Sequence, residues 1–326
     1  MSCNYPIKFE PILKEKIWGG TKLNQLFNKK STANNLGESW EISTVKGDIS
    51  IVANGSLKGQ NLVQLIKTYK ADLLGEKIYA NFGNEFPLLI KFIDAKTDLS
   101  IQLHPNDELA KKRHNSFGKT EMWYVMQADE EARLIVGFNQ EVSKDLYLEK
   151  LAQDDLLSIL NEEKVQHGDT FFIPTGRIHA IGSGVLLAEI QQTSDITYRV
   201  FDWNRVDDNG NARELHTEQA LDALDFSYQE SYKTAYKVEN NSANLVTCPY
   251  FTTNLLVLTK NQKQVTSLKD SFHIYMCVKG AVEIQYNSNL TETISLGVGE
   301  TVLIPACMKE IIIVASADSE LLEVRS

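Results

Sequence analysis

The sequence predicts a mainly β protein made of two related β-units, with helices on the outside of the first unit. Short apolar or alternating segments separated by turn residues dominate the chain, which is typical of strands. The segment 168–174 (GDTFFIP) recurs as 299–305 (GETVLIP), and such an internal repeat indicates two copies of one β-unit. We expect residues 1–235 to form the first domain, with helical insertions, and residues 236–326 to form the second.

Composition and charge exclude several classes of function. The 326 residues are 43% hydrophobic and contain no long apolar run, so we expect a packed core and no membrane partner. The N-terminus lacks the pattern of a signal peptide, and four scattered cysteines are typical of reduced thiols, which together predict a cytoplasmic protein. The net charge of −10 argues against nucleic acid as a partner, and it means that an anionic substrate needs a local basic site. The sequence carries no signal for oligomeric state.

Leucine spacing and apolar runs locate the other elements. Four segments are predicted to be helical: 57–74, 107–114, 142–160 and 216–224. Ser143 is the expected N-cap of the helix in 142–160. The run 86–93 (FPLLIKFI) predicts a buried strand, in which Lys91 is expected either to extend to solvent or to serve the function. A strand is also expected within 35–43, where Glu38 and Glu41 look like ordinary exposed carboxylates. Residues 225–243 have the composition of a linker.

Two strands present polar side chains on one face. In the segment 99–104 (LSIQLH), Leu99, Ile101 and Leu103 share one face. The opposite face carries the polar residues Ser100, Gln102 and His104. Lys119 and Glu121 are likewise two positions apart, at the start of a strand predicted over 122–126. Polar faces of this kind indicate a polar interior between two sheets.

The segment 168–179 (GDTFFIPTGRIH) places a histidine at the start of a strand. A strand ends at Pro174, which has no N–H for the ladder, and Gly176 then permits a tight turn. His179 follows directly, where its imidazole can point into the interior. In the second copy of the repeat, Cys307 and Glu310 take the places of the glycine and the histidine. We therefore expect the second unit to be structural.

Together these segments supply two imidazoles, one carboxylate and one amide oxygen, from His104, His179, Glu121 and Gln102. Zinc accepts such ligands, and catalytic zinc keeps one position open. The same His-Glu-His set also fits the iron triad of non-haem oxygenases, and ligand types alone do not separate the two metals. Three cations lie on strands that can face the same interior, and they favour a phosphorylated substrate: Lys91, Lys119 and Arg199.

Four linked motifs resemble known families. Residues 168–179 match the second motif of the cupins. Four segments resemble the type I phosphomannose isomerases: 102–107 (QLHPND), 118–124 (GKTEMWY), 174–182 (PTGRIHAIG) and 189–199 (EIQQTSDITYR). The chain length and the Trp18-Gly-Gly sequence are similar to the short bacterial branch of that family. The resemblance is strong over residues 5–225 and weak beyond them.

The resemblance implies two cupin jelly-roll barrels and an enzyme with one zinc ion per chain. It implies that mannose 6-phosphate and fructose 6-phosphate are interconverted through a cis-enediol. The implied metal ligands are Gln102, His104, Glu121 and His179. The implied catalytic residues are Arg199, Glu189 and Lys119, and the residues expected to bind substrate are Ser100, Lys91, Asp195 and Trp18.

Several alternatives stay open at this point. The general acid or base is either Glu189 or a metal-bound water. Trp18 has packing as its alternative role. An iron-dependent cupin oxygenase or a non-catalytic cupin that binds sugar phosphates are the alternatives to the isomerase.

Overall fold

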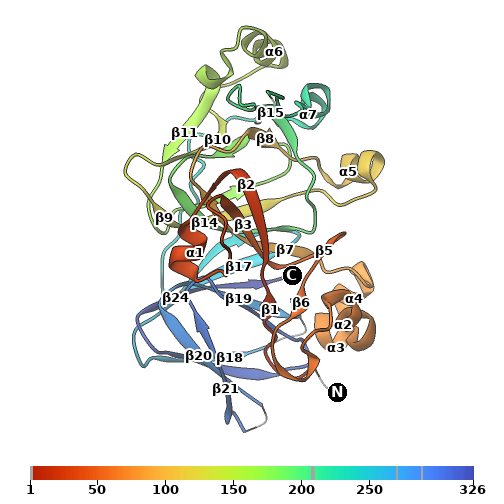
Figure 1. The fold of residues 1–326 in the computed structure, drawn as a ribbon, viewed down its shortest axis with the longest axis vertical. Coiled ribbons are helices and arrows are strands. Elements are labelled where there is room, and N and C mark those ends of the chain that lie inside the picture. Colours follow the sequence, from red (N-terminus) through yellow and green to blue (C-terminus); the bar gives the residue numbers. More distant parts are fainter. Residues whose placement is uncertain (1–2, 207–209, 269–270, 288) are drawn as a thin grey trace.

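The computed structural model describes residues 3–206, 210–268, 271–287 and 289–326. Four larger antiparallel sheets are stacked along the long axis of the molecule (Figure 1), and two short two-stranded sheets accompany them. This arrangement confirms the mainly β fold. Among the described residues, no helix combines the length and the apolar character that crossing a bilayer requires.

The first unit consists of two sheets that face each other. The upper sheet in Figure 1 has the order β11 (Leu160–Lys164), β10 (Arg133–Phe138), β13 (His179–Ile181), β8 (Ile101–Leu103), β15 (Tyr198–Phe201). The lower sheet has the order β12 (Thr170–Ile173), β9 (Glu121–Ala128), β14 (Val185–Gln192), β7 (Leu88–Ala95), β2 (Ile12–Gly20), β3 (Leu36–Ile42). An apolar cluster that includes Ile93, Trp123 and Phe171 fills part of the space between the two sheets. The opposed sheets agree with the expected cupin jelly roll.

The second unit repeats this design with sheets of five and four strands. One has the order β16 (Ser242–Thr247), β17 (Thr252–Leu258), β24 (Ser319–Arg325), β19 (His273–Lys279), β22 (Thr301–Ile304). The other has the order β18 (Lys263–Ser267), β23 (Glu310–Ala315), β20 (Ala281–Tyr286), β21 (Glu292–Gly297). The described residues of this unit contain no helix, as the sequence predicted.

The internal repeat is visible in the backbone. Strands β12 and β22 each follow a glycine with positive φ, 90° at Gly168 and 77° at Gly299, and each ends at the residue before a proline. His179 begins β13 after the first copy, and Glu310 begins β23 after the second. The two copies therefore have the same local structure, but the second presents a carboxylate where the first presents an imidazole.

The lower sheet of the first unit is buried on both faces. On β7, Leu88, Ile90 and Phe92 pack into a core shared with the second unit, while Lys91 and Ile93 face the interior of the first unit. Phe86 contacts Phe272 across this boundary, with ring centroids 4.7 Å apart. Burial on both faces explains why the run 86–93 is apolar without alternation.

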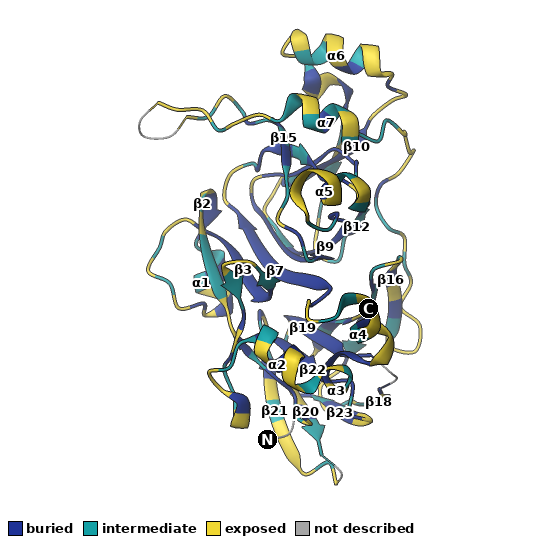
Figure 2. Cartoon of the chain, turned by 90° about the vertical axis from the view of Figure 1, so that its right-hand side faces the viewer, coloured by how far each residue is buried: buried dark blue, intermediate teal, exposed yellow. Residues whose placement is uncertain are grey.

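The helices occupy two positions. Two helices cover the outer face of the upper sheet, as expected: α6 (Lys144–Ala152) and α7 (Thr217–Ala223). The predicted short helix is α5 (Asp107–His114), with Asn106 as its N-cap. Three helices lie beside the second unit (Figure 2): α2 (Leu62–Tyr69), α3 (Ala71–Leu74) and α4 (Glu76–Phe82). The carbonyl of Leu73 accepts a hydrogen bond from the Ala306 N–H at 3.0 Å, so these helices, which belong to the first part of the chain, contact the second unit.

Two predicted helices are shorter than expected. The segment 57–74 is interrupted at Lys70, whose φ of 50° is incompatible with a continuous α-helix. Helix α6 begins after Ser143, as predicted, but ends at Ala152. The leucines that continue its spacing lie in the 3₁₀ turn η2 (Leu156–Ile159) and at the first residue of β11. Such a turn also buries one side, so its leucine spacing resembles that of an α-helix.

The remaining short elements are β1 (Phe9–Glu10), α1 (Lys22–Phe27), β4 (Thr44–Val45), β5 (Asp48–Ile49), β6 (Ile51–Val52) and η1 (Gly55–Leu57).

The N-terminal segment and the predicted linker both contact distant parts of the chain. Ile7 pairs with Leu303 of the second unit. In the 225–243 segment, the Tyr232 hydroxyl donates to the Phe138 carbonyl at 3.1 Å. The domain boundary at residue 235 stays a prediction.

Candidate metal centre and active site

Three buried side chains converge between the two sheets of the first unit. His104 follows β8, Glu121 begins β9 and His179 begins β13, and one ligand atom from each lies within 4.8 Å of the others. Nε2 of His104 lies 3.4 Å from Oε2 of Glu121, and Nε2 of His179 lies 3.5 Å from Oε1. The predicted His-Glu-His cluster is therefore formed by residues from three strands of two sheets.

The turn before His179 explains its position. Gly176 has a φ of 83°, and a Cβ at this residue would lie 2.5 Å from the Ala223 carbonyl oxygen. Only glycine fits both the backbone conformation and the space. The register then sets His179 opposite Gln102 on β8, which brings the amide side chain to the same part of the site.

Hydrogen bonds orient both imidazoles. Nδ1 of His104 lies 2.8 Å from the Ile196 carbonyl oxygen, and Nδ1 of His179 lies 2.8 Å from the Arg177 carbonyl oxygen. A carbonyl can only accept, so each Nδ1 carries the proton and each Nε2 presents a lone pair to the cluster. Burial lowers the pKa of His179, and burial together with the Lys119 charge lowers that of His104 to about 3. Both rings are neutral at pH 7, the form that binds metals.

The cluster has the properties of a cation site. Oε1 of Glu121 and Nε2 of His179 face each other at 3.5 Å and are buried without a hydrogen-bond partner, while Oε2 of Glu121 is paired with the Lys119 ammonium at 3.0 Å. Two buried acceptors without a donor cost free energy unless a cation is bound. Oε1 of Gln102 accepts one hydrogen bond, from the Ser100 hydroxyl at 3.3 Å, and retains a second lone pair. Two nitrogens, a carboxylate and an amide oxygen suit zinc and similar divalent ions.

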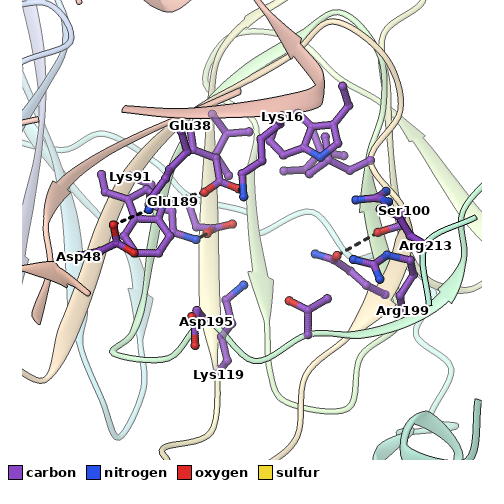
Figure 3. A pocket seen from close by; sticks show the side chains of 18 residues that line it. Lys16, Glu38, Asp48, Lys91, Ser100, Lys119, Glu189, Asp195, Arg199 and Arg213 are labelled. Atoms are coloured by element: carbon purple, nitrogen blue, oxygen red, sulfur yellow. Dashed lines mark hydrogen bonds and ion pairs between the residues drawn. The ribbon is translucent and has the colours of Figure 1, made fainter. Parts of the chain in front are cut away.

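A cavity of about 450 Å³ adjoins this cluster, and its side chains are drawn in Figure 3. Gln102 lines the cavity beside the triad. All residues predicted to act in catalysis or substrate binding also line it: Arg199, Glu189, Lys119, Ser100, Lys91, Asp195 and Trp18. The sequence therefore identified side chains that the fold brings to one cavity. The individual roles assigned to them stay predictions.

Glu189 is a buried carboxylate with two partners. Its Oε1 lies 3.1 Å from Nζ of Lys91, which faces it across β14 and β7, and its Oε2 accepts a hydrogen bond from Trp123 Nε1 at 2.9 Å. Burial, and next the negative charge of Glu121, raise the pKa of Glu189. Lys91 is only 5% exposed and does not extend to bulk solvent. These contacts hold a carboxylate of raised basicity at the cavity wall.

Two arginines form a cationic side of the cavity (Figure 3). Arg199 lies opposite Gln102 in the register of β15 and β8, and its Nη1 donates to the Glu214 carbonyl at 2.8 Å. Its Nε is buried without a partner. Arg213 is held by Asp202, to which its Nε donates at 2.7 Å. An anionic group entering the cavity therefore meets a guanidinium with an unused donor.

Comparison with known proteins places the chain in a family. The model of the catalytic domain of type I phosphomannose isomerases matches residues 7–134. The probable mannose-6-phosphate isomerase GmuF of Bacillus subtilis is 37% identical over 243 residues, which cover 74% of this chain and 75% of that protein. The chain belongs to the type I phosphomannose isomerases.

Two further comparisons, both with proteins of Bacillus subtilis, extend this similarity over nearly the whole chain. The putative mannose-6-phosphate isomerase YvyI is 33% identical over 94% of this chain and 94% of its own length. The crystal structure of a mannose 6-phosphate isomerase superposes with a TM-score of 0.87 at 31% identity, and the match covers 98% of this chain and 99% of the other. The second unit therefore has a counterpart in a solved phosphomannose isomerase structure.

This phosphomannose isomerase also has cavity residues that sequence reasoning missed. Lys14 and Lys16 of β2, with Glu38 and Trp40 of β3, line one side. Nζ of Lys14 and of Lys91 lie 5.0 and 5.1 Å from the Trp40 ring centroid, and Nε1 of Trp40 donates to Glu38 at 2.6 Å. The expectation that Glu38 and Glu41 are exposed is wrong, since they are only 8% and 5% exposed. The two-residue spacing of Glu38 and Trp40 was the available signal.

Proposed function

We propose that the chain is a metal-dependent isomerase that interconverts mannose 6-phosphate and fructose 6-phosphate. The observation that carries this proposal is the buried triad of His104, Glu121 and His179 at the edge of a cavity lined by lysines and arginines. The identity of the substrate is inferred from its relatives, which are named as mannose-6-phosphate isomerases. The net charge of −10 makes a local cationic site necessary for a phosphorylated sugar.

The triad would hold one divalent ion, for which we propose zinc, with Gln102 as the fourth ligand. When bound, the ion would supply a Lewis acid that polarises the substrate oxygens. Oε1 of Glu121 and Nε2 of His179, neither of which has a hydrogen-bond partner, support this assignment. The second unit carries Glu310 in place of the histidine, so we propose one ion per chain.

Glu189 is the proposed general base. An aldose becomes a ketose when a proton leaves C2 of the open-chain sugar, a cis-enediol forms, and a proton is added at C1. A carboxylate of raised pKa accepts a carbon-bound proton more readily than an ordinary one. The Trp123 hydrogen bond and the Lys91 ion pair fix the position of Glu189 while the proton moves.

Lys119 and Arg199 are proposed to act on the substrate oxygens. The Lys119 ammonium borders both the cavity and the triad, where it can donate to an oxygen that gains negative charge. Arg199 offers a planar donor set with its Nε unused, which suits two oxygens of the enediolate or of the phosphate. Ser100, which directly precedes the strand of Gln102 and lines the cavity, can donate to a sugar hydroxyl.

A coupled assay tests the proposal. Purified protein should convert mannose 6-phosphate to fructose 6-phosphate, lose this activity when a chelator removes the metal, and regain it when zinc is restored. Oxygen consumption with iron and none with zinc would favour an oxygenase instead. Binding of hexose phosphates without turnover, in protein that contains its metal, would identify a sugar-phosphate-binding protein.

A further inference from the structure

Two cysteines from opposite ends of the sequence meet beside the second unit, where Cys3 is buried and Cys307 is half-buried. Sγ of Cys3 lies 3.7 Å from Sγ of Cys307, although 304 positions separate them. A disulfide bond is about 2.05 Å long, so the sulfurs need to approach by only about 1.7 Å. The other two cysteines have backbone contacts instead, since the Cys248 thiol lies 3.4 Å from the Phe251 carbonyl oxygen and the Cys277 thiol 3.4 Å from that of Lys279.

The backbone holds the first pair of cysteines together. Ile7 and Leu303 exchange two hydrogen bonds of 2.8 Å, which pair the N-terminal segment with β22. On the other side, the N–H of Cys307 donates to the Asp72 carbonyl at 2.8 Å. Both cysteines are thus placed by contacts that do not involve their thiols. A bond between them requires no search by a mobile chain end.

The two thiols differ in the way that disulfide formation requires. Cys307 is half-buried and lines a cavity of about 290 Å³ together with Lys309, whereas Cys3 is only 3% exposed. The contact with the Cys3 thiol lowers the pKa of Cys307, and the Lys309 charge acts in the same direction, whereas burial and the Asp72 charge oppose this shift. The same contact, with burial, raises the pKa of Cys3. Cys307 is the accessible nucleophile, and Cys3 is positioned to react with it second.

We propose that Cys3 and Cys307 are a modification site at which a hydroperoxide forms a reversible disulfide. The Cys307 thiolate attacks hydrogen peroxide, which forms a sulfenic acid and releases hydroxide. The Cys3 thiol then attacks the sulfenic sulfur, and water leaves. In total, two thiols lose two electrons and two protons, and one peroxide becomes two waters. Cellular thiols reverse the bond by exchange.

The bond ties the N-terminal segment to the second unit. This segment continues through β1 into β2, whose Lys14, Lys16 and Trp18 line the cavity of the first unit. The disulfide closes a loop that includes nearly the whole chain, so it constrains the unfolded state strongly. The oxidised protein should therefore be more resistant to unfolding than the reduced protein.

Thiol counting and peptide mapping test the proposal. Full-length protein is treated with a small excess of hydrogen peroxide, unfolded and titrated for thiols, of which the sequence has four. The count should fall to two, a non-reducing digest should contain the Cys3–Cys307 peptide pair, and dithiothreitol should restore all four. The oxidised form should also unfold at a higher temperature than the reduced form.

Matched variants make the outcome decisive. Cys248→Ser should still lose two thiols, whereas in Cys3→Ser the Cys307 sulfur should be oxidised further to sulfinic acid. Four remaining thiols after peroxide treatment, a sulfinic acid at Cys307 of the unmodified chain, or a bond to Cys248 or Cys277 would each overturn the proposal. A Cys3–Cys307 bond that leaves the unfolding temperature unchanged would overturn the claim that it fastens the segment.

Discussion

The ammonium group of Lys119 lies 3.1 Å from Nε2 of His104, the nitrogen that presents its lone pair to the metal site. It also lies 3.0 Å from Oε2 of Glu121. A positive charge at this position competes with any metal ion for the same two ligands. When an ion binds, the ammonium has to turn toward the cavity, which places it beside the substrate. Lys119 is therefore expected to weaken metal binding and to assist turnover.

Replacing Lys119 should separate these two effects. Lys119→Gln should hold zinc more tightly, because the competing charge is gone, and kcat should fall about 100-fold or more because a donor to the developing charge is lost. Competition with a chelator and steady-state kinetics measure the two quantities. Lys67→Gln, on the exposed side of α2, is the matched control and should change neither. Weaker zinc binding in Lys119→Gln would contradict this account of the contact.

The ligand set makes a graded prediction about metal content. His179→Ala should remove metal and activity together, because the remaining ligands form an incomplete shell. Gln102→Ala should retain more metal, because a neutral amide oxygen contributes less than an imidazole or a carboxylate. Elemental analysis of the purified variants measures this order, with His167→Ala as a histidine control outside the cluster. Greater metal loss in Gln102→Ala than in His104→Ala would remove Gln102 from the ligand set.

The raised pKa of Glu189 predicts the acid limb of the pH profile. A base must be ionised, so kcat/KM should fall as the pH drops through the pKa of Glu189, which lies above the usual value of 4.5 for a glutamate. Burial persists when a metal neutralises part of the Glu121 charge, so the pKa stays raised. Lys91 lowers this pKa, so Lys91→Met should move the limb to higher pH. Lys67→Met should leave it in place, and an unmoved limb in Lys91→Met would exclude Glu189 as the base.

Arg199→Lys should keep the metal but lose turnover about tenfold or more, because lysine cannot hold two oxygens with a planar donor set. If the arginine acts on the enediolate, kcat and kcat/KM fall alike; if it holds the phosphate, KM rises with kcat nearly unchanged. Kinetics and metal content are measured in parallel. Arg133→Lys, whose Nε contacts Glu162 on an exposed edge, is the control. Normal constants in Arg199→Lys would mean that its side chain does not reach the substrate.

One pair between the units should make stability depend on pH. His167 Nε2 lies 2.8 Å from Oε2 of Glu320, and this contact raises the pKa of His167. The stabilisation is complete below the unfolded pKa of about 6.5 and is lost as the pH rises through the higher folded value. Because His167 is partly exposed, the effect should be at most about 1 kcal/mol. The unfolding temperature of the unmodified chain should exceed that of His167→Gln at pH 6 by more than at pH 8.5; an equal difference would contradict the linkage.

The site residues that the sequence revealed are those with a local signal. Ser100, Gln102 and His104 alternate along the sequence within and directly beside β8, and the proline and Gly176 before His179 fix the turn that presents it. Such patterns depend only on neighbouring residues. Glu38 and Trp40 were missed because β2 and β3 reach the cavity by long-range packing. The interruption at Lys70 was missed because a lysine with positive φ leaves no mark in leucine spacing.

The sequence also did not predict that the two units stack on each other. Apolar faces of β7 and β19 each indicate burial, but nothing in either segment says that they bury each other. Ile90 and Ile274 lie in one core that both units share. Only the three-dimensional arrangement shows that the second unit covers the back of the sheet that carries Glu121 and Glu189.

The shared core gives the second unit a structural role that does not depend on catalysis. A fragment ending near residue 235 would expose part of this core, including Leu88 and Ile90, each at a cost of about 2 kcal/mol. Exposed apolar surface of this kind promotes aggregation. The two units should therefore melt in a single transition, and a shortened enzyme would have to carry polar substitutions across the back of β7 to stay in solution.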